Sequence, residues 1–437
     1  MFDKLIIRKR VDGTLSLESC LSPSNDKKQT TMKKIFFYAT LLAVAATSLT
    51  SCEKNGNGVE NPKDNPKDTT ILSKKETALK AAMTPYVDNT VIATYKNLSD
   101  ATITLYNNCE NIFSKFEANA LTDADVKAAA ESWTAARRYW ELSEAFLFGP
   151  AANHNIDPHI DSWPLDKDGM DAMLGNAEQM KLIEEQGADY VGDKLGYGLL
   201  GFHAIEYMLY ASDNADKSNV RTHDISTYTR AELVYLVAVA EDLRNQTVAL
   251  EASWAGIDNI TKEKQAILED AEIDYGVEFA KGYGSYMKVA TGGTYATYQE
   301  AAEELIQGCI DIADEVGNTK IGRPNNASSE EDRNYIESPY ALNSIEDFQD
   351  NIRSIQNAYC GSVAGNASVS DYIKSVDANL DSECKKAIED AIAAIGQIAE
   401  PFASNAKSSE ASNAVKVVGT DLVDVLNKVN AKLSEQN

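Results

Sequence analysis

The residues best suited to chemistry are a histidine and a glutamate, three positions apart in an otherwise apolar segment. Residues 195–210 read LGYGLLGFHAIEYMLY, which only His203 and Glu206 interrupt with ionisable groups that titrate below neutral pH or near it. On a helix this spacing puts both side chains on one face, so both can reach one bound ion. Burying an imidazole and a carboxylate costs several kcal/mol unless each finds a partner. The pair is therefore a metal site or a structural pair between two helices.

A second polar group lies upstream, where residues 153–161 read NHNIDPHID. His154, Asp157, His159 and Asp161 fall within this short stretch. Such a composition allows a second metal patch, and it is equally that of an ordinary polar loop. His223, which completes the four histidines of the chain, is expected in a surface loop.

These histidines form no recognised hydrolase signature. A zinc peptidase needs about three protein ligands, an open coordination position and a general base. The chain contains neither HExxH nor HxxEH, and it offers no evident Ser/His/Asp or Cys/His grouping. The residues therefore favour metal binding over hydrolysis.

The elements that would position these residues are predicted to be helices. From residue 71 onward, apolar residues recur mostly at steps of three and four, and alternating runs of strand length are nearly absent. The clearest stripes cover residues 123–148, 195–210, 228–255, 262–280, 297–316, 345–359 and 382–399. Glycines at 196, 198 and 201 predict close approach of another backbone to the start of the His203 helix. The fold class is therefore all-α.

The two halves of the helical region resemble each other faintly. Each closes a helix with a Gly/Pro segment, continues through an irregular stretch and ends in a long amphipathic helix. This order predicts two helical-bundle domains related by a pseudo-twofold axis, an N-terminal one at 73–258 and a C-terminal one at 259–437.

The N-terminal region has the features of a lipoprotein signal. A basic head at 32–34 and an apolar run at 35–49 precede Cys52, and that run is shorter than the about 20 residues of a membrane span. Residues 32–51 are thus predicted to be a signal peptide, residues 1–31 an upstream extension, and Cys52 the lipidated residue. A polar tether follows at 52–72, and Glu53 favours the outer membrane. The alternative is a chance cysteine after an ordinarily cleaved signal.

Composition narrows the class of protein further. The 437 residues include 41 Lys+Arg and 67 Asp+Glu, for a net charge of −26, which argues against nucleic-acid binding. Without residues 1–51, which hold eight basic and four acidic residues, the chain has 33 Lys+Arg against 63 Asp+Glu, a net charge of −30.

The cysteines Cys109, Cys309, Cys360 and Cys384 form no CxxC pair, so they are disulfide partners or free thiols.

The motif GFHAIEY at 201–207 resembles the GxHxxE signature of the imelysin-like family, also classed as the M75 peptidases. Further resemblances occur, in family order, at 136–137, 143–150, 160–164, 322–324, 337–344, 347–348 and 351–352. Under this resemblance the motif or cleft residues are Gly201, Arg137, Trp163, Glu337, Ser338 and Ser344. Ala341 departs from the pattern, because many relatives are expected to carry a histidine there, which puts a second-half ligand in doubt.

The resemblance implies a two-domain helical protein with its site in the cleft between the halves. The family includes envelope proteins linked to bacterial iron uptake and metal-dependent proteases. Glu144 and Asp161 are then the expected ligands besides His203 and Glu206. Because most of these predicted ligands bind through oxygen, the site suits iron, manganese or calcium better than zinc, and iron is favoured. The sequence thus predicts a lipid-anchored metal-binding envelope protein, served by a transport partner. The alternatives are an M75-type metallopeptidase and a non-catalytic interaction module.

Overall fold

The computed structural model describes residues 7–9, 15–17, 72–214, 220–290 and 292–435. The predicted signal peptide, Cys52 and, apart from residue 72, the tether lie outside the described residues. The chain divides into two compact units, Met1–Thr69 and Thr70–Asn437. In the first unit, strands β1 (Ile7–Lys9) and β2 (Leu15–Leu17) pair antiparallel with Ile7 opposite Leu17.

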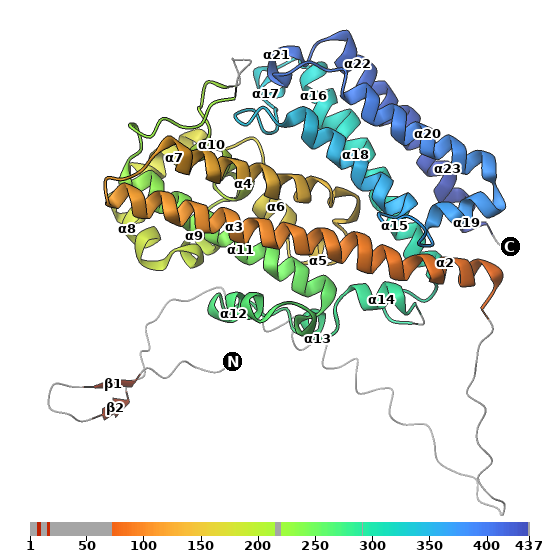
Figure 1. Ribbon diagram of the computed structural model, residues 1–437, viewed down its shortest axis with the longest axis horizontal. Helices are drawn as coiled ribbons and strands as arrows, with labels where there is room; N and C mark the ends of the chain where they lie inside the picture. Colours follow the sequence, from red (N-terminus) through yellow and green to blue (C-terminus); the bar gives the residue numbers. More distant parts are fainter. Residues whose placement is uncertain (1–6, 10–14, 18–71, 215–219, 291, 436–437) are drawn as a thin grey trace, which may run out of the picture. The chain divides into compact units, whose positions relative to one another are not determined.

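The second unit is built from helices, which confirms the all-α prediction (Figure 1). Its first half comprises α2 (Lys74–Pro85), η1 (Tyr86–Val91), α3 (Ile92–Glu117), α4 (Asp123–Glu141), η2 (Glu144–Phe146), α5 (Pro150–Asn153), α6 (Ile156–Ile160), α7 (Lys167–Leu174), α8 (Ala177–Gln186), α9 (Ala188–Lys194), η3 (Tyr197–Leu199), α10 (Gly201–Leu209) and α11 (Arg230–Ala255). Its second half comprises η5 (Ile257–Asn259), α12 (Lys262–Asp270), α13 (Val277–Lys281), α14 (Gly284–Lys288), α15 (Tyr298–Asp314), η6 (Glu315–Ile321), α16 (Gly322–Asn325), α17 (Glu330–Arg333), α18 (Ser344–Cys360), α19 (Val369–Val376), α20 (Ala378–Ile395), α21 (Phe402–Asn405), α22 (Ser409–Lys416), η7 (Val417–Leu422) and α23 (Val423–Ser434).

The long helices lie in two groups that meet along α4 and α18. Figure 1 shows α3, α4 and α11 side by side, and α15, α18, α20 and α23 form the other group. α2 belongs to the predicted first domain, yet it packs against α15 and α19 of the predicted second. One hydrophobic core runs through both groups, from Leu79 to Leu433. The predicted duplication and its boundary therefore remain predictions.

Three helices are shorter than their apolar stripes predicted. α4 ends at Glu141 and is followed by the 3-10 turn η2, so the prediction of one helix over 123–148 was wrong. The stripe at 262–280 is broken into α12 and α13. α10 begins only at Gly201, because Leu200 is extended and Gly201 has a positive φ. At η2 the hydrophobic periodicity continues across a turn that is itself buried, whereas the apolar residues of 271–276 and of η3 are at most partly buried, so their spacing does not mark a helix there.

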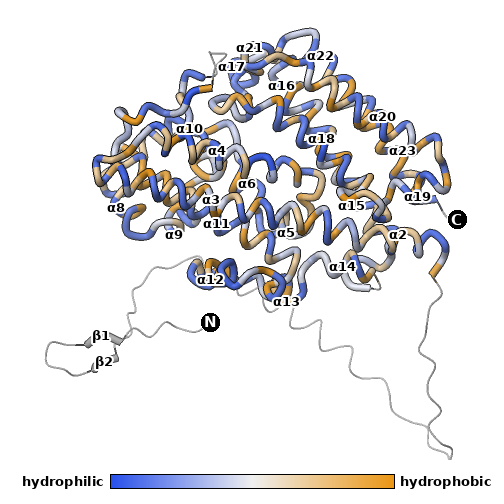
Figure 2. Tube along the Cα trace, in the orientation of Figure 1, coloured by the Kyte–Doolittle hydropathy of each residue, from blue (hydrophilic) through white to orange (hydrophobic). Residues whose placement is uncertain are grey.

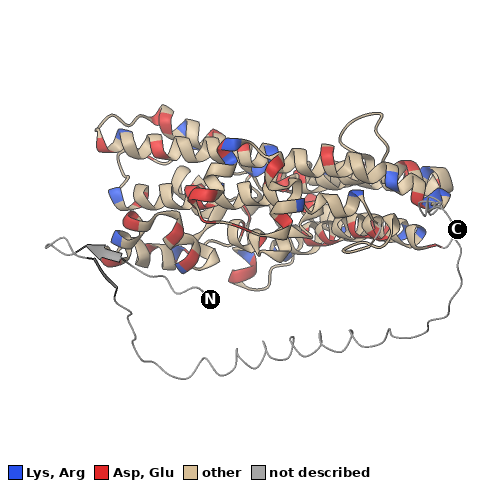
Figure 3. Cartoon of the chain, turned by 90° about the horizontal axis from the view of Figure 1, so that it is seen from below, with Lys and Arg blue, Asp and Glu red and all other residues tan. Residues whose placement is uncertain are grey.

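Apolar and polar residues segregate as expected for helices around a shared core. Figure 2 shows hydrophobic and hydrophilic residues alternating along the long helices, and Figure 3 shows acidic and basic residues distributed over the helices. Cys109, Cys309, Cys360 and Cys384 are all free, and only Cys360 is partly exposed. Within the described residues, every helix is too short or too polar to cross a membrane.

The start of α4 offers a test of local stability. The backbone N–H of Thr122 donates to the Asp125 carboxylate at 3.0 Å, and Lys115 forms an ion pair with the same group. We expect Asp125→Ala to lower the free energy of unfolding by about 1 kcal/mol, as loss of a helix cap does. Glu131→Ala, which removes an exposed pair with Lys127 on the same helix, should change it by less than about 0.5 kcal/mol.

The pH dependence of this effect has a defined sign. Lys115, followed by the hydroxyl of Thr122, lowers the pKa of Asp125 to about 2. The carboxylate therefore stabilises the fold above its ordinary pKa of about 3.9, and this contribution is lost as the pH falls towards 2. Urea denaturation of both variants across that range measures it. Equal losses for Asp125→Ala and Glu131→Ala at neutral pH would contradict the assignment.

Candidate metal centre

A close backbone contact brings the start of α10 against the end of α6. Gly201 has a φ of 68°, in the left-handed region that side chains disfavour. A Cβ at this position would overlap the carbonyl of Ile160, the last residue of α6. Because Asp161 follows directly, and His203 lies two residues beyond Gly201, this contact sets the two side chains face to face. The close approach predicted from the glycines is found at Gly201.

Glu206 fixes the orientation of the His203 ring. His203 Nδ1 lies 3.1 Å from Glu206 Oε2, and since an ionised carboxylate can only accept, Nδ1 is the donor. The other carboxylate oxygen, Oε1, accepts the backbone N–H groups of Tyr340 at 2.8 Å and Ala341 at 2.9 Å. Both oxygens of Glu206 are therefore engaged, and Nε2 of His203 is directed away from Glu206.

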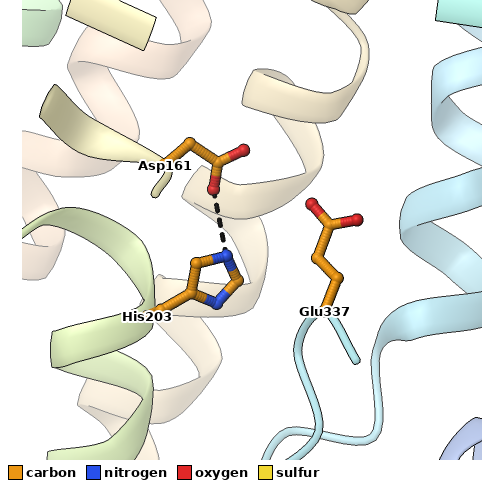
Figure 4. Close-up of side chains that lie close together, drawn as sticks. All are labelled: Asp161, His203 and Glu337. Atoms are coloured by element: carbon orange, nitrogen blue, oxygen red, sulfur yellow. Dashed lines mark ion pairs between the residues drawn. The ribbon is translucent and has the colours of Figure 1, made fainter. Parts of the chain in front are cut away.

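The Nε2 atom of His203 faces Asp161. It forms an ion pair at 3.2 Å with Asp161 Oδ1 (Figure 4). The two atoms are not aligned for a hydrogen bond, and no other described residue makes a hydrogen bond with Nε2. Burial by itself lowers the pKa of His203, yet its contacts with Asp161 and Glu206 outweigh burial and raise the pKa to about 9. In the metal-free protein the ring is thus a buried imidazolium, 2% exposed.

Asp161 is held as a carboxylate by its neighbours. Arg137 Nη1 forms an ion pair with Oδ1, and Trp140 Nε1 donates to Oδ2 at 2.7 Å. Burial alone would raise the pKa of Asp161, but Arg137 and His203 keep it well below its usual range. Asp161 is therefore ready to bind a cation without first losing a proton.

Glu337 brings a second carboxylate to the same place from the other half of the chain. Its Oε1 accepts from Arg137 Nη2 at 2.5 Å and from Lys320 at 3.1 Å, whereas Oε2 has no hydrogen-bond partner among the described residues. Asp161, His203 and Glu337 each offer one ligand atom, and these three atoms lie within 4.8 Å of one another. All three side chains are buried, and Figure 4 shows Glu337 across from the other two.

The loop before α18 determines where Glu337 lies. Ser338, with a φ of 50°, turns the chain, and its hydroxyl donates to Asp347 Oδ2 at 2.5 Å. Ser344 donates its hydroxyl to the carbonyl of Glu337, also at 2.5 Å. The motif residues therefore hold this loop in two ways, Ser338 through the Asp347 side chain on α18 and Ser344 through the backbone carbonyl of Glu337.

Lys320 reaches the centre from η6, a π-helix. π-Helical turns are rare and are found frequently at functional sites. Gly317 in this turn packs against Gly419 of η7, where a Cβ would not fit. Lys320 Nζ lies over the ring of Trp163 at 5.3 Å from its centroid, so Trp163 forms part of the wall around the centre.

Buried carboxylates outnumber buried cations at the centre. The acidic side chains are Glu141, Glu144, Asp161, Glu206, Glu337 and Asp347, and their permanent counter-charges are Arg137 and Lys320. Burial raises the pKa of Glu141 well above its usual range, and burial raises the pKa of Asp347 to about 7 although Arg137 opposes this. A bound cation would compensate the charge of these carboxylates and displace the protons that a raised pKa lets them keep.

The predicted ligands His203, Glu206, Glu144 and Asp161 do not surround one point. His203 and Asp161 come together, whereas Glu206 orients the ring and Glu144 belongs to a second three-ligand grouping with Glu141 and Asp161. The importance of Glu141 and Lys320 was missed. Glu141 carried one signal in the sequence, since it lies four residues after Arg137, on the same face of α4.

The predicted second metal patch at 153–161 is split between partners. His154 Nε2 lies 2.7 Å from Glu278, while His159 Nε2 lies 2.7 Å from Asp242. Within the described residues, neither histidine joins a three-ligand grouping. The two histidines serve as hydrogen-bond partners that attach this segment to α13 and α11.

The donor set fits a metal ion of intermediate to hard character. One imidazole nitrogen and two carboxylate oxygens converge, and two of these residues have an atom without a hydrogen-bond partner, His203 Nε2 and Glu337 Oε2. Nitrogen and oxygen ligands suit iron, manganese and zinc, and a higher share of oxygen shifts preference towards hard ions. A hydrogen bond from Nδ1 to a carboxylate is the usual support of a metal-binding histidine.

Comparison with known proteins gives a consistent family. The family model described as Imelysin, Peptidase M75, matches residues 91–429. A curated protein named "Iron-regulated protein A", from Synechococcus elongatus, is 26% identical over 276 residues, and the match spans 63% of this chain and 63% of that protein. A crystal structure from Parabacteroides distasonis, titled as an iron-regulated protein A precursor, has a TM-score of 0.69 and 27% identity, covering 84% of this chain and 98% of that one. An imelysin-like protein from Psychrobacter arcticum has a TM-score of 0.52 at 14% identity, covers 84% of this chain and 95% of that one, and shares the fold.

Gly201 can be tested against Gly196, a glycine of the same apolar segment. Gly201→Ala would force a side chain into the left-handed region and into the Ile160 carbonyl, so we expect a loss of more than about 2 kcal/mol in the free energy of unfolding. Gly196→Ala is the control, because Gly196 has a φ of −75° and open space around it. Thermal or urea denaturation compares the two. Equal stability of both variants would show that the α10–α6 contact does not depend on glycine.

The charge of His203 gives a second test, in protein stripped of metal by a chelator. Its pKa is about 9 in the fold against about 6.5 in an unfolded chain. The imidazolium therefore stabilises the fold fully below pH about 6.5, and this contribution is lost as the pH rises through 9. The stability difference between wild type and His203→Gln should shrink across this window. His223→Gln should show no such loss, because burial lowers the pKa of His223. An NMR titration showing neutral His203 at pH 7.5 would contradict this.

Proposed function

The chain belongs to the imelysin family, and we propose that it is an envelope protein that binds a metal ion, iron in the first place, through His203, Asp161 and Glu337. The same nitrogen and oxygen ligands can also bind manganese, calcium or zinc. We propose a role in metal acquisition, with the lipid anchor at Cys52 holding the protein at the outer membrane and a transport partner exchanging the ion.

The observation that carries this proposal is the buried Nε2 atom of His203. It has no hydrogen-bond partner among the described residues, and it faces two carboxylates, Asp161 and Glu337. Its ion pair with Asp161 at 3.2 Å falls outside hydrogen-bond geometry, and a buried ring nitrogen that makes no hydrogen bond although it faces carboxylates needs an explanation. A metal ion in place of the Nε2 proton supplies one. Ion binding would then release a proton.

The proposed ligand set differs from the GxHxxE pair read alone. Glu206 contacts Nδ1 of His203 and lies outside the three-ligand grouping, so we assign it to holding the ring, and we assign the direct contact to Glu337, whose Oε2 has no hydrogen-bond partner among the described residues. Support for iron comes from the oxygen-rich donors and from the name "Iron-regulated protein A" of two relatives.

A metallopeptidase remains the second candidate, since the family carries the M75 peptidase name. It would need a free general base and room for a polypeptide. Glu206 is engaged at both oxygens, and the centre is buried, with Asp161 only 4% exposed. These features favour binding over hydrolysis. The third candidate, an interaction module, would keep His203 and Glu206 as a structural pair only.

Metal retention by matched variants tests the proposal. We expect His203→Ala and Glu337→Gln to weaken binding by at least about 100-fold, and Glu206→Gln by about 10- to 100-fold, the range for residues that support a metal-binding histidine. His223→Ala should bind as wild type does. Equilibrium dialysis with iron, manganese, zinc and calcium, followed by elemental analysis, measures each.

Three outcomes separate the candidates. Equal metal retention by wild type and His203→Ala/Glu337→Gln would contradict the centre. Chelator-sensitive cleavage of an unstructured polypeptide, abolished by Glu206→Gln, would establish the peptidase instead. Metal-free protein with full thermal stability, and no shift in melting when metal is added, would favour the interaction module.

A further inference from the structure

Three acidic side chains other than the proposed ligands Asp161 and Glu337 line a small pocket next to the metal centre. Glu144 comes from η2, Asp157 from α6 and Glu315 from η6. The pocket has a volume of about 240 Å³, and Asp161 of the centre also lines it. At about 30 Å³ for each water molecule, this volume holds an ion together with its water shell. Glu144 and Glu315 also line an adjoining hollow of about 360 Å³, whose wall includes Glu304 and Asp311.

None of these three carboxylates has a counter-charge in contact. Among the described residues, no hydrogen bond and no ion pair reaches the side chain of Glu144, Asp157 or Glu315. Glu144 is only 7% exposed, so an unpartnered acidic group more than nine-tenths buried is directed into the pocket. Lys320 also lines the pocket, but its ammonium group contacts Glu337 and Glu141.

Burying three carboxylates together is costly, because each anion raises the energy of the next. Burial, and then the carboxylates of Asp161 and Glu315, raise the pKa of Asp157 to about 7. Burial raises the pKa of both Glu144 and Glu315 as well. A cation between them would remove this repulsion.

We propose that Glu144, Asp157 and Glu315 form an outer site, in which a hydrated multivalent metal ion binds before it passes to His203. The onward passage rests on the proposed function. Asp161 connects the two places, since it lines the pocket and belongs both to the His203 grouping and to a grouping with Glu141 and Glu144. The acidic residues Glu304 and Asp311 of the adjoining hollow continue the negative charge towards solvent.

A metal ion suits this pocket better than an organic ammonium ion. Aromatic walls are what a protein uses to recognise quaternary ammonium groups. Here the two aromatic residues of the pocket already face the protein's own cations, Trp163 facing Lys320 and Tyr335 facing Arg323. The groups left for a ligand are carboxylate oxygens, which hard multivalent ions prefer.

The test counts Mn²⁺ ions bound to the full chain and measures how fast they load. Equilibrium dialysis in about 0.15 M salt, which screens weak surface binding, compares wild type, Glu144→Gln/Glu315→Gln and His203→Ala. The control is Glu263→Gln/Glu269→Gln, which removes the same charge from exposed positions on α12. Stopped-flow quenching of tryptophan fluorescence by Mn²⁺ gives the loading rate.

We expect wild type and the control to bind one more ion than Glu144→Gln/Glu315→Gln. That variant should keep its remaining ion and load it at least about tenfold more slowly, because an acidic approach raises the rate of cation binding. His203→Ala should keep the outer ion. If Glu144→Gln prevents folding, Asp157→Asn/Glu315→Gln poses the same question with partly exposed residues.

The outcomes that overturn the outer site differ from those that overturn the centre. If Glu144→Gln/Glu315→Gln matches wild type in ion count and loading rate, the outer site is wrong and the proposed function stands. If His203→Ala abolishes all binding, the outer site is wrong as an independent site. If wild type binds no Mn²⁺, iron, zinc or calcium, the proposed function and the outer site are both wrong.

Discussion

The buried guanidinium of Arg137 is the interaction on which the arrangement of the site depends. It forms ion pairs with Glu141 on its own helix, Asp161 after α6, Glu337 in the loop before α18, and Asp347 on α18. These partners come from both halves of the chain. A fully buried cation must be matched by anions in good geometry, and an arginine can bind several through its fixed set of donors. Arg137 thus joins the halves and collects the carboxylates.

Gathering so many carboxylates around Arg137 and Lys320 creates the capacity to bind a further cation. Acidic groups outnumber these two cations, and within the part of the chain that the structure describes, Glu144, Asp157 and Glu315 make no ion pair. The proposed metal centre and the proposed outer site therefore have the same physical origin. Both follow from burying more acid than the protein's own bases neutralise, in a chain whose net charge is already −26.

Backbone geometry then decides which atoms face each other. Gly201 allows α10 to touch the end of α6, so that His203 meets Asp161, and the turn at Ser338 brings Glu337 opposite them. The π-helix η6 carries Lys320 into the same space. Each device lies within a few residues of the group that it positions. Small local departures from regular helix thereby produce a site that regular helices alone would not.

The sequence by itself determined the helical class, the polar pair on an apolar segment and the family, because hydrophobic periodicity and short motifs are local properties of a chain. His203 and Asp161 could be nominated from it. It could not determine that one oxygen of Glu206 accepts hydrogen bonds from the backbone N–H groups of residues 340 and 341. Nor could it determine that Glu337 lies beside the His203 ring. It also left Glu141 and Lys320 unrecognised. Those roles depend on contacts between segments far apart in the chain, and only tertiary packing decides which carboxylate keeps a free oxygen.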